Sequence, residues 1–277
     1  NSTGMTDLQK RPLVSVIIPT KNSARTIGDC LLSIQKQTYD NLEIIVVDNN
    51  STDVTFEIAQ KFTQKAYRYG PERSAQRNYG ASKALGQYLL FVDSDMTLTP
   101  NVIDECINTC QENNVVATYI PEKIIGKGFM IKIRDFERSF YTGTVIDAVR
   151  FIKKDVFQQT GGFDERMTGV EDWDLDRKVK CYGKTRVINS FILHNEGKFD
   201  TKKYLEKKEY YIKSGLELYK EKWNNDEIVK MQLGAYYRLW KVFTEKGKWK
   251  KFFKHPILSL GVCYLRIRVG LRYLSSS

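Results

Sequence analysis

The sequence predicts a doubly wound α/β fold, in which a mostly parallel sheet carries helices on both faces. Three observations lead to this prediction: apolar β-branched runs that suit buried strands, helical segments that alternate with them, and short connections between the two. The 277 residues are 42% apolar and 28% charged, which is a globular rather than a disordered composition. This length accommodates one large α/β domain with an appendage, or two small domains.

The expected strands are apolar runs without polar alternation. The first, residues 13–18 (LVSVII), suits a strand buried on both faces of a parallel sheet, and Pro19 is expected to end it. Further strands are expected at residues 42–47, 66–69, 87–92, 115–119, 148–153 and 186–193. Helices are expected at residues 25–37 after a cap at Asn22 or Ser23, from a cap at Ser51 and Thr52 to Gln64, and at 73–84, 100–113 and 171–181.

Polar segments follow three of the expected strands. They read PTKN after Ile18, DNNSTD after Val47 and DSD after Val92. In an open α/β sheet, ligands bind beyond the carboxyl ends of the strands, where such segments meet. The sequence therefore predicts one polar, acidic crevice at this edge of the sheet.

Asp93 and Asp95 are the first candidate site in this crevice. Two carboxylates two residues apart at a strand end can hold a hard divalent cation against a diphosphate, whose charge as a leaving group needs neutralising. An Asp-x-Asp by itself is more often a solvated turn. Its place directly after the run QYLLFV, beside two other polar strand ends, favours the ligand-binding interpretation.

The loop after the second strand supplies further candidates. A carboxylate there can accept a hydrogen bond from a ribose hydroxyl or a base N–H, which we expect of Asp48, whereas Asp53 is expected at a helix terminus. Arg73 and Arg77 lie at the start of the next helix, and a guanidinium suits phosphates and planar bases. Ordinary surface charges are the alternative for both arginines.

A second motif combines Gly161 and Gly162 with the acids Glu171 and Asp172 at a helix start. Glycines permit close approach of the backbone to a ligand, and an acid at this place can act as a general base. The alternative is that the helix dipole alone favours acids there. His194, expected directly after a strand, is either a metal ligand beside Asp95 or a hydrogen-bonded core histidine.

Taken in order, VSVIIPTKN, VVDNNSTD, RNYGASKALGQYLLFVDSD, GGFDER and EDWDL resemble the family 2 glycosyltransferases, which are inverting enzymes with the GT-A fold. The resemblance covers about residues 13–195. It implies Mg²⁺ or Mn²⁺ as cofactor and a nucleotide-sugar donor, with UDP favoured over GDP. The site residues that it implies are Pro19, Thr20, Lys21, Asn22, Asp48, Arg77, Asp93 and Ser94 for the nucleotide, Asp95 and His194 for the metal, Asp172 as base, and Glu171 and Trp173 on the acceptor side.

The sequence departs from the processive members of this family. It has no Gln-x-x-Arg-Trp motif after Asp172, so we expect a single sugar addition rather than polymerisation. The segment HNEG, residues 194–197, resembles a motif of some non-processive members, which favours His194 as a metal ligand. A sugar nucleotidyltransferase is disfavoured because PTKNS is not a glycine-rich triphosphate loop.

The excess positive charge lies entirely in the last part of the chain. From Lys198 onward 19 Lys and Arg face 8 acids, whereas residues 1–197 carry 25 of each, and the whole has a net charge of +11. Tyr and Trp are interleaved with the lysines, a composition that suits the headgroup region of an anionic membrane. The longest apolar run is about ten residues, too short to cross a bilayer. A solvated helical appendage and nucleic-acid binding are the alternatives, the last disfavoured because no recognition motif is present.

These observations predict three parts: residues 1–4 as an expression-tag remnant, 5–197 as the catalytic domain and 198–277 as a basic aromatic helical appendage. The five cysteines form no Cys-x-x-Cys pair and are expected to be reduced, which favours the cytosol. The basic part of the chain then predicts a place at the cytoplasmic face of a membrane.

The predicted activity is transfer of one sugar to a hydroxyl of a lipid-linked acceptor. The alternatives are a polyprenyl (dolichyl) phosphate sugar synthase and a non-catalytic membrane or nucleic-acid binding protein with a degenerate fold.

Overall fold

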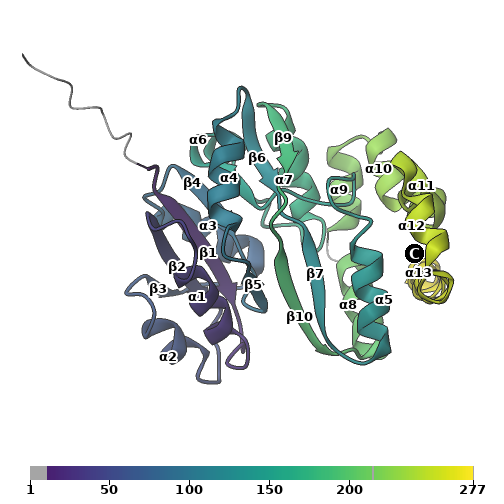
Figure 1. The fold of residues 1–277 in the computed structure, drawn as a ribbon, viewed down its shortest axis with the longest axis horizontal. Helices are drawn as coiled ribbons and strands as arrows, with labels where there is room; N and C mark the ends of the chain where they lie inside the picture. The colour runs from purple at the N-terminus through teal and green to yellow at the C-terminus, as the bar shows by residue number, and fades with distance from the viewer. Residues whose placement is uncertain (1–10, 214, 277) are drawn as a thin grey trace, which may run out of the picture.

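A computed structural model describes residues 11–213 and 215–276, so the expected tag remnant at residues 1–4 lies outside the described residues. Its main feature is a seven-stranded, mostly parallel sheet (Figure 1). In spatial order the strands are β3 (Ala66–Arg68), β2 (Leu42–Asp48), β1 (Val14–Thr20), β4 (Tyr88–Phe91), β8 (Phe151–Lys153), β6 (Val115–Tyr119) and β9 (Lys184–Val187). Only β8 runs antiparallel to its neighbours. The predicted α/β fold class is confirmed.

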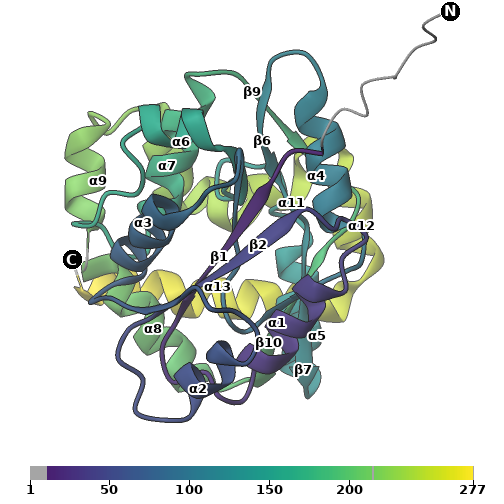
Figure 2. The same ribbon diagram turned by 90° about the vertical axis from the view of Figure 1, so that its left-hand side faces the viewer.

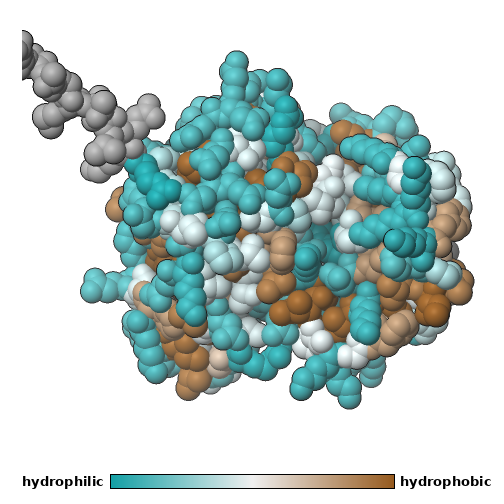
Figure 3. All heavy atoms as spheres, in the orientation of Figure 1, coloured by the Kyte–Doolittle hydropathy of each residue, from teal (hydrophilic) through white to brown (hydrophobic). Residues whose placement is uncertain are grey.

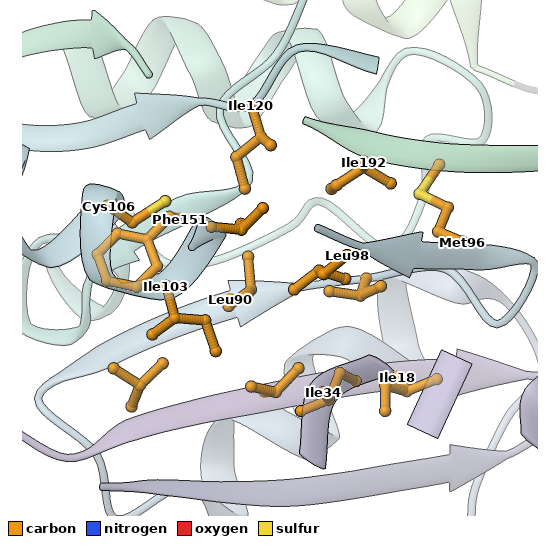
Figure 4. Close-up of a cluster of buried hydrophobic side chains, with 14 of the residues drawn as sticks. Ile18, Ile34, Leu90, Met96, Leu98, Ile103, Cys106, Ile120, Phe151 and Ile192 are labelled. Atoms are coloured by element: carbon orange, nitrogen blue, oxygen red, sulfur yellow. The ribbon is translucent and has the colours of Figure 1, made fainter. Parts of the chain in front are cut away.

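The interior strand β1 is buried on both faces, as its apolar run predicts. Val14, Val16 and Ile18 point into one hydrophobic core, and Ile17 points into the other. This alternation follows from the period of two in a strand. Figure 4 shows the first core, where Ile18 and Leu90 from the sheet meet Ile34 and Ile103 from the helices.

Helices cover both faces of this sheet. Figure 2 shows α1 and α3 on opposite sides of β1 and β2. On one face lie α1 (Ile27–Gln35), α2 (Thr55–Gln60) and α4 (Val102–Gln111); on the other lie α3 (Arg73–Lys83), α6 (Lys154–Gln159) and α7 (Glu171–Lys180). Their buried residues recur at helical spacing, as in Ile27, Leu31 and Ile34 of α1.

Several expected element ends are wrong. The helix expected at residues 25–37 after a cap at Asn22 or Ser23 spans Ile27–Gln35 and has no side-chain cap, and the helix expected to reach Gln64 ends at Gln60. Pro19 does not end β1, which continues to Thr20, because β4 pairs only as far as Ile17 and the missing N–H of Pro19 is not needed there. Ser51 and Thr52 do not cap the next helix. The N-cap residue is Val54, and no side chain caps the helix. Asp53 lies directly before it, and its carboxylate accepts a hydrogen bond from the backbone N–H of Thr55 at 3.0 Å. The expectation that Asp53 lies at a helix terminus is confirmed.

A second, three-stranded sheet lies beside the first and was not predicted. It consists of β5 (Met96–Leu98), β10 (Ile192–Lys198) and β7 (Glu122–Lys127). The single strand expected at residues 186–193 is therefore wrong: β9 belongs to the large sheet and β10 to the small one. The chain turns between them where the backbone N–H groups of Asn189 and Ser190 donate to the carboxylate of Glu105 at 2.8 and 2.9 Å. His194 lies within β10 rather than after a strand.

The remaining helices form a layer against the small sheet (Figure 1). They are α5 (Phe129–Arg138), α8 (Thr201–Lys213), α9 (Leu216–Lys222), α10 (Glu227–Leu233), the π-helical turn η1 (Tyr237–Lys241), α11 (Val242–Thr244), the 3₁₀ turn η2 (Glu245–Gly247), α12 (Trp249–Lys254) and α13 (Pro256–Ser276). Phe136 and Phe140 of the α5 region share a hydrophobic cluster with Phe243, Phe252 and Leu265. No helix among the described residues has the length and apolar character that spanning a membrane requires.

Candidate active site

The three polar segments predicted to meet at the carboxyl edge of the sheet do so. Asn22, after β1, accepts a hydrogen bond from the backbone N–H of Thr52 at 2.9 Å and donates its own backbone N–H to the Ser51 hydroxyl at 2.8 Å. The hydroxyls of Ser23 and Ser94 lie 2.8 Å apart. The loops after β1, β2 and β4 are therefore tied into one wall.

The residues expected to line the nucleotide pocket differ in how accessible they are. Lys21 and Asn22 are exposed at the edge, whereas Pro19 and Thr20 are buried. Asp48 is also buried, and its carboxylate accepts hydrogen bonds from the Ser51 backbone N–H, at 2.8 Å, and from the Ser51 hydroxyl. Asp48 thus holds the loop after β2 in place, and its contact with a nucleotide stays a prediction.

Arg77, on α3, is the centre of the site. Its side chain is 2% exposed, and its two terminal nitrogens donate to different carboxylates: Nη2 to Asp93 at 2.7 Å and Nη1 to Asp172 at 2.9 Å. Burial opposes its positive charge, but Asp172 and Asp93 outweigh this and raise the pKa of Arg77. One guanidinium thereby joins Asp93 of the Asp-Ser-Asp segment to Asp172 of the Glu-Asp pair, which lies 95 positions after Arg77 in the sequence.

Asp93 is ionised because of this pairing. Burial opposes its charge, but the guanidinium groups of Arg77 and Arg150 hold the pKa of Asp93 far below its usual value. The Nη1 atom of Arg150 lies 3.7 Å from the second carboxylate oxygen of Asp93. Asp93 is therefore a fixed anion between two arginines, with little capacity to bind a cation as well.

Asp95 and His194 lie together, as predicted, at the start of the small sheet. The Nε2 atom of His194 is 3.3 Å from an oxygen of Asp95, and its Nδ1 atom is 2.6 Å from an oxygen of Glu122. Burial opposes protonation of this histidine, but the hydrogen bonds with Asp95 and Glu122 raise the pKa of His194 to about 10. The Asp95 side chain is 42% exposed, so it is accessible from the crevice.

The two acids at the start of α7 have different environments. Glu171 is 1% exposed and lies 3.3 Å from Arg73 and 3.9 Å from Arg77. Burial and the neighbouring charge of Asp172 raise the pKa of Glu171. The Asp172 side chain is 44% exposed and lines a cavity. Its Oδ1 atom pairs with Arg77, and its Oδ2 atom has no hydrogen-bond partner among the described residues. Asp172 is the acid of this pair that a ligand can reach.

This cavity, of about 280 Å³, extends from the strand ends toward the C-terminal helices. Trp173 lines it and donates its indole N–H to the backbone carbonyl of Ile146 at 3.2 Å. The cavity is rich in charge: its described lining includes nine Lys or Arg and five Asp or Glu. The basic residues are Arg73, Arg77, Arg134, Arg138, Arg150, Lys207, Lys208, Arg238 and Arg266; the acidic ones are Asp93, Glu122, Asp147, Asp172 and Glu196.

Several of these residues were not singled out from the sequence as parts of the site. Glu122 accepts from His194, Arg138 and Arg150 at 2.6, 3.0 and 3.3 Å, and so connects the histidine to the second arginine of Asp93. Its region of the sequence has no clear periodicity. Arg150 directly precedes β8. A charged residue inside the apolar strand expected at residues 148–153 was the one sequence signal that could have marked it as a site residue.

Comparison with known proteins identifies the family. The profile described as "Glycosyl transferase family 2" matches residues 15–163, more than half of the chain. The chain belongs to the family 2 glycosyltransferases. The segment that carries the match contains Asp48, Arg77, Asp93 and Asp95. The predicted resemblance is therefore confirmed, and with it the assignment as a glycosyltransferase.

Individual relatives agree with this assignment. The chain is 33% identical over 117 residues to an uncharacterized glycosyltransferase of Haemophilus influenzae, covering 39% of this chain and 46% of that protein. It is 37% identical over 109 residues to glycosyltransferase GlyG of Streptococcus pneumoniae, covering 37% and 36%. These matches span less than half the length of either relative.

Solved structures with the same fold are more distant in sequence. The mannosyltransferase PcManGT of Pyrobaculum calidifontis, in complex with GDP-Man and Mn²⁺, superposes with a TM-score of 0.64 at 18% identity, covering 97% of this chain and 86% of that one. TarS of S. aureus, residues 1–349 with UDP-GlcNAc, superposes with a TM-score of 0.58 at 19% identity, covering 95% and 90%. At this level of identity the likeness establishes the GT-A fold of the chain.

Proposed function

We propose that the protein transfers a single sugar from a nucleotide-diphosphate donor to an acceptor hydroxyl, with inversion at the anomeric carbon and with a divalent metal ion. The observation that carries this proposal is Arg77, which holds Asp93 and Asp172 on two sides of one cavity. Such an arrangement suits a donor bound over the strand ends and an acceptor bound toward α7. The donor-bound structural neighbours support a nucleotide-sugar as substrate.

In this proposal the donor lies along the wall formed by the loops after β1, β2 and β4. Pro19, Thr20, Lys21, Asn22 and Asp48 contact the nucleoside. Asp93 and Ser94 face the ribose, and Arg77 lies near the phosphates. A UDP-sugar is the preferred donor.

The side chains of Asp95 and His194 suit a hard divalent cation. They offer one accessible carboxylate and, once the metal displaces the proton on Nε2 of His194, one imidazole nitrogen. Glu122 holds the other ring nitrogen, a common arrangement around metal-binding histidines. Within the described chain no group of three or more His, Cys, Asp and Glu gathers to hold a metal. Asp95 and His194 would therefore share Mg²⁺ or Mn²⁺ with the donor diphosphate, where it would neutralise the charge of the leaving group.

Asp172 is the proposed base. Its free Oδ2 atom accepts the proton of the acceptor hydroxyl, the hydroxyl oxygen forms a bond to the anomeric carbon, and the bond from that carbon to the diphosphate breaks. The electron pair leaves with the nucleoside diphosphate, so one displacement inverts the configuration. Glu171, buried against Arg73, positions this end of α7, and Trp173 offers a platform for the acceptor.

We further infer a lipid-linked acceptor and a place at the cytoplasmic face of a membrane. Exposed Tyr236, Trp240, Trp249 and Phe253 accompany many lysines in the C-terminal helices. Aromatic and basic side chains together suit the headgroup region of an anionic bilayer.

Calorimetric titration of UDP and of GDP, with and without Mn²⁺, tests the donor part of this proposal. We expect metal-dependent binding of one nucleotide, lost in Asp95→Ala. Glu165→Gln, an exposed acid outside the cavity, is the matched control and should bind as the wild type does. Absence of binding by a folded protein would contradict the proposal.

The charge of the cavity favours one second candidate, a synthase that transfers the sugar directly to a polyprenyl phosphate. A phosphate oxygen is already anionic at neutral pH, so it needs no base. Transfer that is insensitive to Asp172→Asn would favour this reaction over transfer to a hydroxyl.

A further inference from the structure

A second cavity, of about 470 Å³, lies next to the charged one and differs from it in character. Its wall is mostly apolar and comes from the start of α7 and from α8, α9, α10, η1 and α13. Among its residues are Val170, Leu216, Leu233, Leu239, Ile267 and Leu271. Its volume falls within the range of small-molecule sites. Figure 3 shows apolar residues gathered toward the lower right of the molecule, where Figure 1 places α5 and the C-terminal helices.

The two cavities share part of their walls. Gly169, Trp173, Lys208, Tyr211, Arg238 and Arg266 line both. Trp173 directly follows Asp172 in sequence, so the shared wall begins beside the proposed base. A ligand that occupies both cavities would therefore be charged at one end and apolar at the other.

The shared wall carries positive charge that the protein does not neutralise. Arg266 pairs with Glu137. Lys208 and Arg238, in contrast, have no carboxylate within ion-pair distance among the residues that the structure describes. Both are half-buried, and their charged groups lie over aromatic rings, Lys208 5.5 Å from the centre of Tyr204 and Arg238 5.8 Å from that of Trp173.

Two neighbouring cations without partners are costly to bury unless an anion accompanies them. Burial and the positive charges of Arg134 and Arg238 lower the pKa of Lys208 to about 7. Arg238 also lies in the π-helical turn η1, and such turns occur frequently at functional sites. These features point to a bound anion at the junction of the two cavities.

We propose that Lys208 and Arg238 bind the phosphate of an acceptor lipid, and that the apolar cavity between α10, η1 and α13 holds its hydrocarbon chain. This inference rests on the proposed function, which it deepens by placing the acceptor. The apolar walls account for the chain, the unpaired cations account for the phosphate, and the shared wall beside Asp172 accounts for the connection to the site of transfer.

Calorimetric titration of farnesyl phosphate, farnesol and inorganic phosphate tests this proposal. The titrations are made with Mn²⁺ and a saturating nucleotide, so that the donor pocket is filled. We expect farnesyl phosphate to bind about tenfold or more tightly than either other probe, since only it combines the anion with buried CH₂ groups. Lys208→Met should weaken its binding about tenfold, whereas Lys203→Met, at an exposed position of the same helix, should not.

Gly270→Phe tests the apolar part separately. Gly270 lines the cavity, and a Cβ atom added there meets no other atom within 4 Å, so a side chain can be attached at this position. Farnesyl phosphate should then bind about tenfold more weakly, while inorganic phosphate and nucleotide bind as before. Ile257→Phe, on the same helix but outside the cavity, is the control. Should Gly270→Phe fail to fold, Leu239→Gln places a polar group on the same wall and carries the same expectation.

The outcomes separate this inference from the proposed function. If the nucleotide binds but farnesyl phosphate binds no better than inorganic phosphate, the lipid site is wrong and the donor site stands. Equal binding of farnesol and farnesyl phosphate would overturn the role of Lys208 and Arg238. If no nucleotide binds, the proposed function fails, and the titrations without nucleotide still decide whether the cavities hold a lipid phosphate.

Discussion

At the edge of the large sheet, two carboxylates with different roles pair with the same guanidinium. Arg77 pairs with one oxygen of each carboxylate. The second oxygen of Asp93 faces Arg150, whereas Asp172 opens to the cavity. The distribution of arginines therefore separates a fixed anion from an available one. This difference is a property of single residues, and it supports Asp172 as the acid that we propose for proton transfer.

The first prediction concerns the base. Asp172→Asn keeps the shape of the side chain but removes its ability to accept a proton, so kcat should fall by about 10²- to 10⁴-fold. Nucleotide affinity should change less than about twofold, since the change leaves Asp95 untouched. Release of nucleoside diphosphate from the donor, with extracted membrane lipids as acceptors, is the measurement. Near-native turnover of a folded variant would exclude Asp172 as the base and make Glu171 the next candidate.

The second prediction concerns Arg77 as a structural ion. Arg77→Met removes a buried positive charge and leaves Asp93 and Glu171 with one arginine partner each, so the free energy of unfolding should fall by about 3–5 kcal/mol. Urea denaturation measures this. Arg166→Met is the comparison: Arg166 pairs with Asp164 at the surface, where solvent screens the interaction, so its loss should cost far less stability than the loss of Arg77. Equal losses for the two variants would contradict the structural role of Arg77.

The sequence predicted part of this site for a physical reason. Asp93, Asp95 and the loop of Asp48 lie at the carboxyl ends of strands. Because the carboxyl ends of parallel strands lie at one edge of the sheet, the local sequence pattern was sufficient to predict that these residues lie near one another. Glu122 and Arg150 were missed as site residues because their neighbours in the site come from distant segments. No periodicity along the chain reports that Glu122 on β7 lies against His194 on β10.

At the scale of elements, the C-terminal helices add cations to a cavity whose described acidic residues all precede residue 198. Lys208 on α8 and Arg238 on η1 face the same cavity as Asp172 on α7. The charge asymmetry along the sequence therefore reappears in the cavity: its lining residues before 198 include five basic and five acidic ones, whereas its described lining residues after 198 include four basic ones and no acid. The expected boundary at residue 198 stays a prediction, but α13 and α5 share a hydrophobic cluster across it.

The third prediction follows from the burial of Lys208. Its pKa is lowered to about 7, whereas in the unfolded chain it is about 10.4, because burial and Arg134, Arg238 and Lys207 disfavour the charge more than Glu137 favours it. Below pH 7 the protonated amine costs stability in full. Between these two pKa values the unfolded state binds the extra proton, so this cost shrinks as pH rises.

Lys208→Met should therefore stabilise the protein, and more at pH 6.5 than at pH 9.5. If the gain near neutral pH is about 1 kcal/mol, the melting temperature should rise by about 2–4 °C. Thermal unfolding of both proteins at the two pH values measures this. A destabilised variant, or a gain that grows with pH, would contradict the assignment of Lys208 as an unpaired buried cation.

The elements themselves were predictable to different extents. Long buried strands such as β1 and β6 have continuous apolar runs that favour a strand over other structures, and their prediction is confirmed. The three-residue strand β5 and the half-exposed strand β7 have no such pattern and form because β10 lies between them. The break between β9 and β10 depends on a contact with Glu105 of α4, which is distant in sequence, so the local sequence pattern could not predict it.

At the scale of the whole molecule, one side combines positive charge with exposed apolar groups. On α13 the side chains of Ile257, Leu260, Tyr264, Ile267 and Leu271 are exposed at helical spacing, whereas Val262 and Leu265 are buried. The last 80 residues carry the whole net charge of +11. Charge attracts such a surface to an anionic bilayer from a distance, and apolar side chains hold it there by burial.

These two contributions differ in their response to salt, which gives the fourth prediction. Raising the salt from about 0.01 M to about 1 M shortens the Debye length from about 30 Å to about 3 Å, so the charge contribution weakens whereas apolar burial does not. In flotation assays we expect strong binding to phosphatidylglycerol vesicles at low salt, weaker but measurable binding at high salt, and little binding to phosphatidylcholine.

The double variant Ile257→Glu and Leu260→Glu separates the two contributions. Both positions are exposed, at 70% and 71%, so the fold should be unaffected, but binding at high salt should be lost. Ser2→Glu with Thr3→Glu adds the same charge at the other end of the chain and should leave that binding intact. A wild-type protein that stays unbound at low salt would contradict a membrane surface, and equal loss in both variants would show that net charge alone governs attachment.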